Sequence, residues 1–460
     1  IDMENTSYGI TPEEKAAAAH CLEYALGCGA SQVRVSLNKS VLDTFMLLNG
    51  ELDKVTHCAD RSVFIYLFVD GRYGTYSTNR LDRENIEDFV RKAIDSTRML
   101  AEDEYRKLPQ ADRMAEGAVT GRELGLYDRE YELMSTDRRL ALAMSGTIFK
   151  KASAVEGYEI ISEECEYSDS IDDNYVIDSQ GFEGRHTETS FAFWTEMTIS
   201  GPDGHRYSGY HWSSSPFFDE LKIAGCSEEA LQKAADQINP RPHKGGKLKM
   251  VVRNTSSSRL ISPIFSALNA SAIQQRNSFL ENTLGKKIFP EELTVIDMAR
   301  TFGKPGSRLF DTEGVATCER AVIDKGVIGT YFVNTWSAGK MGIAPTIEGI
   351  SRPVVTPFVK GGCNIDGDID ENAIVGICGE GILVTGFNGG NCNPTTGNFS
   401  YGIEGFAFKD GRLLHPVKEM VVTGNMISLW SSLVAAGSDA LPGTRWQIPT
   451  LAFDGVDFSA

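Results

Sequence analysis

The first half of the sequence alternates between the apolar spacing of helices and that of strands. Residues 11–30 predict a helix, because Thr11 can serve as its N-cap, Pro12 suits its first turn and glycines stand at its end. Residues 82–101 place their hydrophobic side chains on one helical face. Further helices are predicted over residues 136–154 and 227–238.

Turn signals divide the sequence between these helices into strands. Asn49-Gly50 and Asp70-Gly71 are hairpin dipeptides, and similar turns are expected at 179–181 and 202–204. The order helix, antiparallel meander, helix therefore occurs twice. It suggests an internal duplication of a helix and strand unit.

The second half is rich in glycine, asparagine and short strands, after a Pro- and Gly-rich boundary at 239–249. Residues 256–277 are an exception, because their apolar residues fall four apart and predict one amphipathic helix. The predicted fold class is α+β, with a C-terminal domain that is mainly β with a few helices. We expect an N-terminal domain at 1–240, with possible sub-units at 10–102 and 121–238. We expect a C-terminal domain at 246–460.

Composition limits the possible functions of this 460-residue chain. A hydrophobic fraction of 41% and a charged fraction of 23% are typical of a globular protein, and no apolar run approaches the length of a membrane span. The net charge of −18 disfavours direct binding to nucleic acid, and the longest basic cluster, 241–249, lies in the predicted linker. We expect neither a membrane nor a nucleic-acid partner.

The cysteines and the first residues favour the cytoplasm. Nine cysteines, an odd number without a C-x-x-C pair, suit reduced thiols better than a disulfide framework. The first twenty residues lack the basic and apolar regions of an export signal. A cytoplasmic location is therefore expected.

The seven histidines form no zinc-binding motif. His205 and His211 are six residues apart and would share a face on a continuous strand, but Gly209 makes that register uncertain, so two surface histidines are the simpler interpretation. The adjacent His57 and Cys58 would point to opposite faces of a strand. No G-x-S-x-G motif or phosphate-binding glycine loop accompanies them.

Two groups of carboxylates are candidates for holding a hard cation. Asp311 and Glu313 are close in sequence, and a second group follows a D-x-D-x-D pattern at Asp366, Asp368 and Asp370. The second group departs from a calcium loop, because Glu371 replaces its turn glycine and Ile377 its closing glutamate. An exposed acidic loop is the preferred interpretation.

Several long segments together resemble one family. The stretches "LFDTEGVATCERAVIDKGVIGTYFVNTWSAGKMG", "TGFNGGNCNPTTGNFSYGIEGFAFKDGRLLHPVKEMVVTGN" and "FVDGRYGTYSTNRLDRENIEDFVRKAI" resemble the TldD/PmbA family, long labelled modulators of DNA gyrase. The resemblance extends over about residues 10 to 458. Its TldD-like branch carries H-E-x-x-x-H on a helix and a further cysteine near the C-terminus, which hold a catalytic metal.

This chain is similar to the other branch, the PmbA/TldE-like one. The helix predicted at 256–277 has no histidine, carboxylate or cysteine, and the tail at 435–456 has no cysteine. The resemblance therefore implies no catalytic residue, no metal ligand and no cofactor in this chain. It implies a TldD-like metalloprotease subunit as partner and extended peptides as substrates, with a possible homodimer of the isolated protein.

A glycine-rich segment is the candidate surface for a substrate or partner. Glycine permits close approach of another backbone, and the segment 385–398 is dense in glycine and asparagine; tight turns are the alternative explanation. The residues of this candidate surface are Gly386, Asn388, Gly389, Gly390 and Asn391.

Two other functions compete with that of a metal-free subunit. One is an autonomous peptidase or hydrolase, whose activity would depend on His205 or His211. The other is a regulatory binder of a topoisomerase or of DNA, linked to DNA gyrase. The net charge of −18 argues against binding to DNA.

Overall fold

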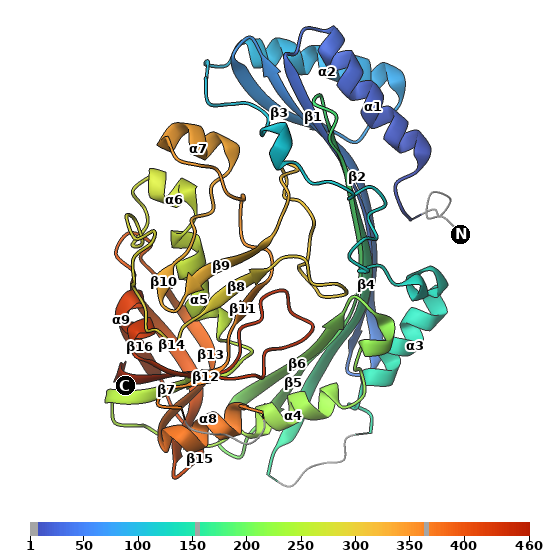
Figure 1. Cartoon of the computed structure of the whole chain (residues 1–460). Coiled ribbons are helices and arrows are strands. Elements are labelled where there is room, and N and C mark those ends of the chain that lie inside the picture. The colour runs from blue at the N-terminus through green and yellow to red at the C-terminus, as the bar shows by residue number, and fades with distance from the viewer. Residues whose placement is uncertain (1–7, 152–156, 363–367) are drawn as a thin grey trace.

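One long antiparallel sheet dominates the first half of the computed structural model, which describes residues 8–151, 157–362 and 368–460. Its six strands follow the order β3-β2-β1-β4-β5-β6. The longest strand has 20 residues, which corresponds to about 66 Å of extended chain. Figure 1 shows that the sheet bends into an arch over this length. The strands are β1 (Gln32–Leu48), β2 (Glu51–Val69), β3 (Arg72–Thr78), β4 (Glu159–Asp178), β5 (Glu183–Ser200) and β6 (Arg206–Ser215).

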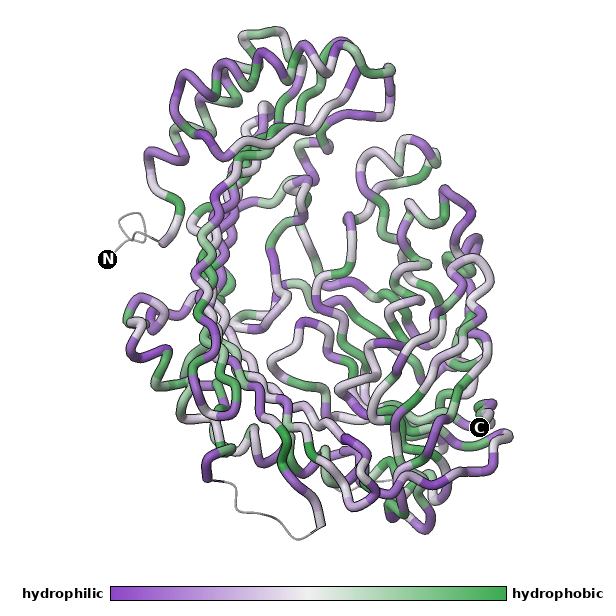
Figure 2. Tube along the Cα trace, turned by 180° about the vertical axis from the view of Figure 1, so that it is seen from behind, coloured by the Kyte–Doolittle hydropathy of each residue, from purple (hydrophilic) through white to green (hydrophobic). Residues whose placement is uncertain are grey.

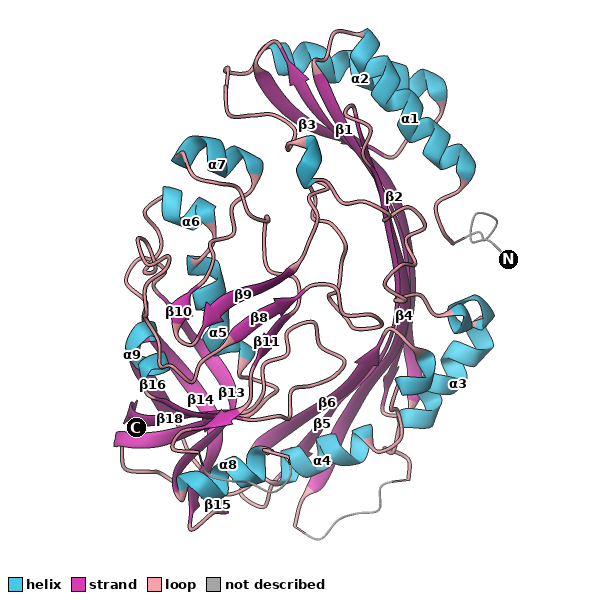
Figure 3. Cartoon of the chain, in the orientation of Figure 1, coloured by secondary structure: helices cyan, strands magenta, loops and turns pink. Residues whose placement is uncertain are grey.

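Four helices cover the convex side of the arch, two near each end (Figures 1 and 3). The first begins as its sequence predicts, because the Thr11 hydroxyl accepts a hydrogen bond from the Glu14 backbone N–H at 3.2 Å. Apolar side chains of the first two helices and of β1 and β2 form one core. The helices are α1 (Pro12–Gly27), α2 (Arg83–Arg98), α3 (Thr136–Gly146) and α4 (Cys226–Ala235).

The third helix is shorter than the sequence predicts. It ends at Gly146, where an added Cβ would lie 2.1 Å from the ring of Phe193. The backbone N–H groups of Ile148 and Phe149 then donate to the Glu163 carboxylate, both at 3.0 Å. These bonds replace the helical ones and turn the chain away. The predicted helix over 136–154 is therefore wrong at 147–151, which are not helical. Its last residues, 152–154, lie outside the described residues.

The two predicted meanders join into a single sheet. The element order α1-β1-β2-β3-α2 is followed by α3-β4-β5-β6-α4, and β1 pairs with β4 from Arg34–Asp178 to Leu48–Glu164. The joint between the two units is thus a full antiparallel strand pair. The domain boundaries and the duplication remain predictions.

The second half is built around a closed ring of strands. β7 pairs in parallel with β13 and antiparallel with β18, so the ring β7-β13-β14-β16-β18 closes. A smaller sheet, β10-β9-β8-β11, packs beside it. The strands are β7 (Gly246–Val252), β8 (Val295–Met298), β9 (Glu319–Asp324), β10 (Val327–Ile328), β11 (Pro353–Val355), β12 (Phe358–Val359), β13 (Glu380–Cys392), β14 (Asn398–Lys409), β15 (Arg412–Pro416), β16 (Met420–Asn425), β17 (Leu433–Ala436) and β18 (Leu451–Ser459).

Short helices complete this half and confirm the mixed α+β class. The stretch 256–277 forms two helices instead of the predicted one, because the Asn269 side chain accepts from the Ser271 N–H at 2.9 Å and caps a new helix. The helices are α5 (Ser258–Ala267), α6 (Ala270–Gln274), α7 (Thr335–Met341), α8 (Glu371–Cys378) and α9 (Met426–Ser431). None of the helices in the described ranges has the length and hydropathy needed to cross a bilayer.

The concave side of the arch faces the C-terminal half (Figure 1). Figure 2 shows hydrophilic and hydrophobic residues alternating along the arch, as expected for a sheet whose two faces differ. Specific contacts join the halves: Trp336 Nε1 donates to Asp103 Oδ2 at 2.8 Å, and the rings of Phe182 and Phe310 pack edge to face. Cavities remain between the halves where the arch stands away from the second half.

Candidate functional site

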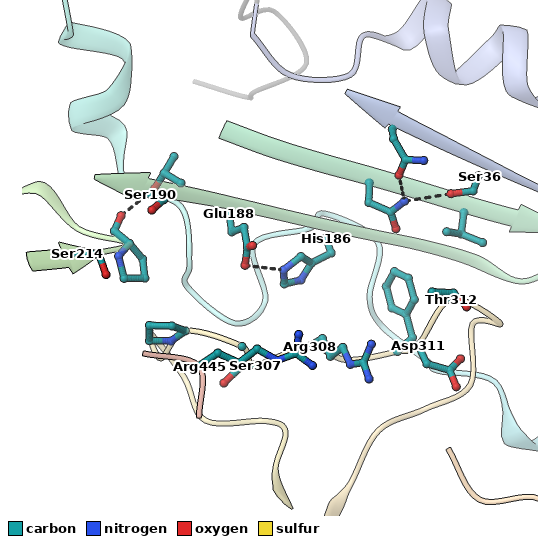
Figure 4. Close-up of a pocket in the computed structure, with 18 of the residues that line it drawn as sticks. Ser36, His186, Glu188, Ser190, Ser214, Ser307, Arg308, Asp311, Thr312 and Arg445 are labelled. Carbon is teal, nitrogen blue, oxygen red and sulfur yellow. Dashed lines mark hydrogen bonds and ion pairs between the residues drawn. The ribbon is translucent and has the colours of Figure 1, made fainter. Parts of the chain in front are cut away.

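A cavity of about 680 Å³ lies between the middle of the arch and two loops of the C-terminal half (Figure 4). The loops are 305–312 and 443–445. Most of the strand residues that line it alternate along their strands, because alternate side chains share one face of a strand. The alternating residues are Ser36 and Asn38 on β1, Phe64 and Tyr66 on β2, Asn174 and Val176 on β4, and His186, Glu188 and Ser190 on β5. Thr189 on β5 and Ser214 and Ser215 on β6 also line the cavity, outside this alternation.

Part of the floor of this cavity is polar and internally hydrogen-bonded, beside the apolar side chains of Phe64 and Val176. The Asn174 amide donates to Ser36 Oγ at 3.1 Å and also to the Asn38 side chain. His186 Nε2 lies 3.2 Å from a carboxylate oxygen of Glu188. Amide, hydroxyl and imidazole groups of this kind can bind the N–H and C=O groups of a peptide main chain.

Carboxylates organise the loop that forms the roof. The Asp311 side chain accepts hydrogen bonds from the backbone N–H groups of Glu313, Val315 and Glu348 at 2.9–3.1 Å. Burial raises its pKa to about 6. Glu313 instead accepts from the backbone and hydroxyl of Thr335, both at 3.0 Å. The two carboxylates considered for a cation thus hold different loop segments.

A second cavity of about 1050 Å³ lies between the β6–α4 region and the C-terminal half. His211 lines it, and its Nδ1 lies 2.9 Å from Lys233 Nζ. Burial, and then the Lys233 charge, lower the pKa of His211. Arg253, also on the wall, makes a two-point ion pair with Glu371 at 2.6 and 2.8 Å.

The structure does not bring His205 and His211 together. Six residues of extended chain separate them by about 20 Å, and His205 lies at an exposed turn, 3.3 Å from Asp203. His57 is likewise exposed, with its Nδ1 at 2.8 Å from Asp43. A metal site shared by His205 and His211 is therefore incompatible with this fold.

The predicted glycine-rich surface lies on one strand pair. Gly386, Asn388, Gly389, Gly390 and Asn391 all belong to β13, where the pairing with β14 is irregular between Asn388 and Asn391. A Cβ on Gly390 would lie 1.9 Å from the carbonyl oxygen of Ser400, so strand packing requires this glycine. These five residues are absent from the walls of both cavities in the described parts of the chain. Their role in binding remains a prediction.

The acidic segment before α8 is only partly described. Asp370 caps that helix, because its carboxylate accepts from the Ala373 N–H at 2.8 Å. Asp366 lies outside the described residues, so the structure does not address the possible calcium loop.

Helix α5 and the C-terminal tail lie side by side, as the resemblance implies. The rings of Phe265 and Trp446 pack edge to face at 5.1 Å, and Ser257 Oγ donates to the Ile448 carbonyl at 3.1 Å. Leu260 and Ile264 are fully buried among other apolar side chains. Hydrocarbon groups cannot ligate a metal ion, so the residues at this position do not fit the metal that a metallopeptidase of this fold would hold.

No three His, Cys, Asp or Glu side chains come together in a metal-binding arrangement within residues 8–151, 157–362 and 368–460. Models of a metallopeptidase family match the chain as the PmbA/TldA domain 1 at 33–97, the central domain at 130–238 and the C-terminal domain at 245–460. The chain belongs to the PmbA/TldD family.

Individual relatives in the PmbA/TldD family match this chain over nearly its full length. A crystal structure from Bacteroides thetaiotaomicron VPI-5482, provisionally named a modulator of DNA gyrase, is 41% identical, with a TM-score of 0.92 over 98% of this chain and 100% of that one. The metalloprotease PmbA homolog of Haemophilus influenzae is 24% identical over 97% of this chain and 96% of its own. TldE from Thermococcus kodakarensis, at 17% identity, has the same fold, with a TM-score of 0.80 over 96% of this chain and 100% of its own.

The sequence did not predict which residues of this PmbA/TldD chain line the cavities. Arg308 and Arg445 stand in irregular loops far apart in sequence, and only the fold places both on one cavity wall. Lys233 and Arg253, from different halves of the chain, both line the second cavity. Charged residues in loops carry no periodic signal, so sequence patterns alone do not reveal them.

Proposed function

We propose that this chain is a non-catalytic subunit of a TldD/TldE-type metalloprotease complex. One observation carries the proposal: α5, at the position where the catalytic branch keeps its metal-binding motif, buries Leu260, Ile261 and Ile264 completely in the core. In this proposal the metal and the general base belong to a TldD-like partner. This chain contributes binding surface for the substrate.

The substrate in this proposal is an extended peptide or an unfolded segment of a small protein. The polar part of the floor of the 680 Å³ cavity offers hydrogen-bonding groups for a main chain. The sheet also has an open edge, since β3 pairs with β2 only from Val63 to Val69, and residues 51–62 have no second strand partner among the described pairings. Leu52 and Val55 are 47% and 48% exposed along this edge. Such an edge can take up an extended chain as an added strand.

The proposed location is the cytoplasm. Eight cysteines in the described part of the chain are free thiols, including the exposed Cys58 and Cys318. Free exposed thiols suit a reducing compartment.

The open edge of the sheet along β2, which would hold a peptide or a partner, also allows a homodimer of the isolated protein.

Reconstitution with a TldD-like protein from the same organism tests this function. Each chain is purified alone and then mixed, and cleavage of an unfolded reporter peptide is measured. We expect a stable complex, no cleavage by this chain alone, and cleavage by the complex that is lost when the partner's H-E-x-x-x-H histidines are replaced. Cleavage by this chain alone, sensitive to His211→Ala, would instead support an autonomous hydrolase.

A further inference from the structure

Two arginines from different loops stand on the same wall of the 680 Å³ cavity (Figure 4). Arg308 Nε donates to Ser351 Oγ at 2.7 Å, and its Nη2 to the Gly349 carbonyl at 3.0 Å. Arg445 Nε donates to the Ser351 carbonyl and its Nη2 to the Ile350 carbonyl, both at 2.6 Å. The segment 349–351 thus fixes both side chains.

Backbone contact also holds these two loops together. A Cβ on Gly306 would lie 2.3 Å from Cγ of Arg445, so the first loop packs directly against that side chain. Each guanidinium uses its Nε and Nη2 atoms for these bonds, and neither Nη1 atom has a hydrogen-bond partner among the described residues. Neither arginine forms an ion pair with a carboxylate of the described residues within 4.0 Å.

The close approach of two cations has an electrostatic cost. Burial and then the charge of Arg308 lower the pKa of Arg445. The charges of Asp297 and Glu188 act in the opposite direction and raise the pKa of Arg445. The Asp297 carboxylate itself accepts hydrogen bonds from the backbone N–H groups of Ser351 and Arg352 at 2.6–3.2 Å. A bound anion would relieve the repulsion between the arginines, because guanidinium forks match the geometry of a carboxylate.

Other groups around the arginines define the site further. Ser307 is 1% exposed and lines the same cavity, and its hydroxyl has no hydrogen-bond partner among the described residues. On the opposite strand stand His186 and Glu188, which contact each other at 3.2 Å. Asp311, the remaining carboxylate on the wall, already accepts three backbone hydrogen bonds.

We propose that Arg308 and Arg445 bind a carboxylate group of an extended peptide. The inference rests on the proposed function as a peptide-holding subunit and specifies how one end of the peptide is held. The cavity volume of about 680 Å³ matches a site for a few residues and not for a folded domain. The C-terminal carboxylate is the expected source, and an acidic side chain is the alternative source of the same group.

Binding of short labelled peptides to the isolated full-length chain tests this proposal. Three N-terminally fluorescein-labelled alanine-serine hexapeptides are compared by anisotropy: one with a free C-terminus, one amidated, and one amidated with glutamate as its last residue. We expect the free acid to bind at least tenfold more tightly than the amide. Tight binding of the glutamate peptide would support the carboxylate site and add side chains as a source. Equal binding of all three peptides, or no binding of any, would overturn the proposal.

Variants separate the proposed contact from a general loss of structure. Arg445→Gln is expected to weaken binding of the free-acid peptide at least tenfold and to leave binding of the amidated peptide unchanged. Arg300→Gln is the matched control, because Arg300 is also bonded to a hydroxyl and a carbonyl, at 3.2 and 3.4 Å, but lies outside the cavity. Unchanged binding by Arg445→Gln would refute the assignment.

A variant that gains affinity provides the most specific test. Glu188→Gln removes the negative charge that faces the arginines. We expect it to tighten binding of the free-acid peptide about threefold to tenfold. A misfolded variant would not bind the peptide more tightly. Weaker binding would contradict the proposed orientation. Because these assays use the isolated chain, failure of the carboxylate site is distinguishable from failure to form a complex with a TldD-like partner.

Discussion

At the residue scale, two adjacent glycines in β13 have different structural roles. Gly389 and Gly390 both have positive φ, at 65° and 75°. An added Cβ meets nothing within 4 Å at Gly389, whereas at Gly390 it meets the Ser400 carbonyl at 1.9 Å. The glycine-rich pattern therefore combines one conformational requirement with one steric requirement, and only the structure separates them.

Gly390→Ala is expected to lower the free energy of unfolding by about 3 kcal/mol or more, because the strands must separate to admit the methyl group. Gly389→Ala, the matched control, should cost only the left-handed backbone penalty of roughly 1–2 kcal/mol. Urea denaturation followed by tryptophan fluorescence measures both. Equal losses would show that the close contact with Ser400 does not limit this position.

Asp311 makes stability depend on pH in an unusual direction. Its pKa is raised by burial from 3.8 to about 6, so between these values the folded chain binds a proton that the unfolded chain does not. The stability it contributes is complete below about pH 4 and is lost as the pH rises through 6. The loss amounts to roughly 3 kcal/mol from the size of this shift.

Comparison with Asp311→Asn isolates this contribution. The stability of the wild type relative to the variant should fall by roughly 3 kcal/mol between pH 4 and pH 7, measured by urea denaturation at several pH values. Asp324→Asn, at the exposed end of β9, serves as control and should show no such trend. A relative stability that rises with pH would mean that the backbone hydrogen bonds to Asp311 outweigh its burial.

At the element scale, α5 is a core helix whose inward face is hydrocarbon. Ile264 is fully buried, whereas Ser266 on the same helix is exposed. Ile264→Ala is expected to lower the free energy of unfolding by about 2–5 kcal/mol through the cavity it leaves, and Ser266→Ala to change it by less than about 0.5 kcal/mol. Thermal and urea denaturation test the pair. Similar effects of both would contradict the tight packing of α5 against Trp446 and its neighbours.

The sequence predicted elements whose signals are local. Thr11 and Pro12 mark the start of α1, and Asn49 and Asp70 adopt the positive φ values of 54° and 49° that their hairpin turns require. It could not predict the pairing of β1 with β4, because strand partners distant in sequence leave no periodic signal. The division of 256–277 into α5 and α6 depends on the Asn269 cap, which the apolar spacing did not reveal.

At the scale of the whole molecule, the arch and the C-terminal half together create the candidate sites. Neither Ser36 on β1 nor Arg445 near the C-terminus forms a site alone, but both line the same cavity. The sequence identified the family and the apolar character of α5. The cavity depends on how the halves face each other, and for that reason it emerged only from the structure.

Native mass spectrometry of the co-expressed complex tests the central claim most directly. This chain and a TldD-like protein from the same organism are purified together, and the masses of the complex and of each released subunit are recorded with their bound metal. We expect a heteromeric complex in which the metal stays with the TldD-like subunit and this chain, released alone, carries none. A stoichiometric metal ion on this chain, or the absence of any complex between the two proteins, would contradict the account.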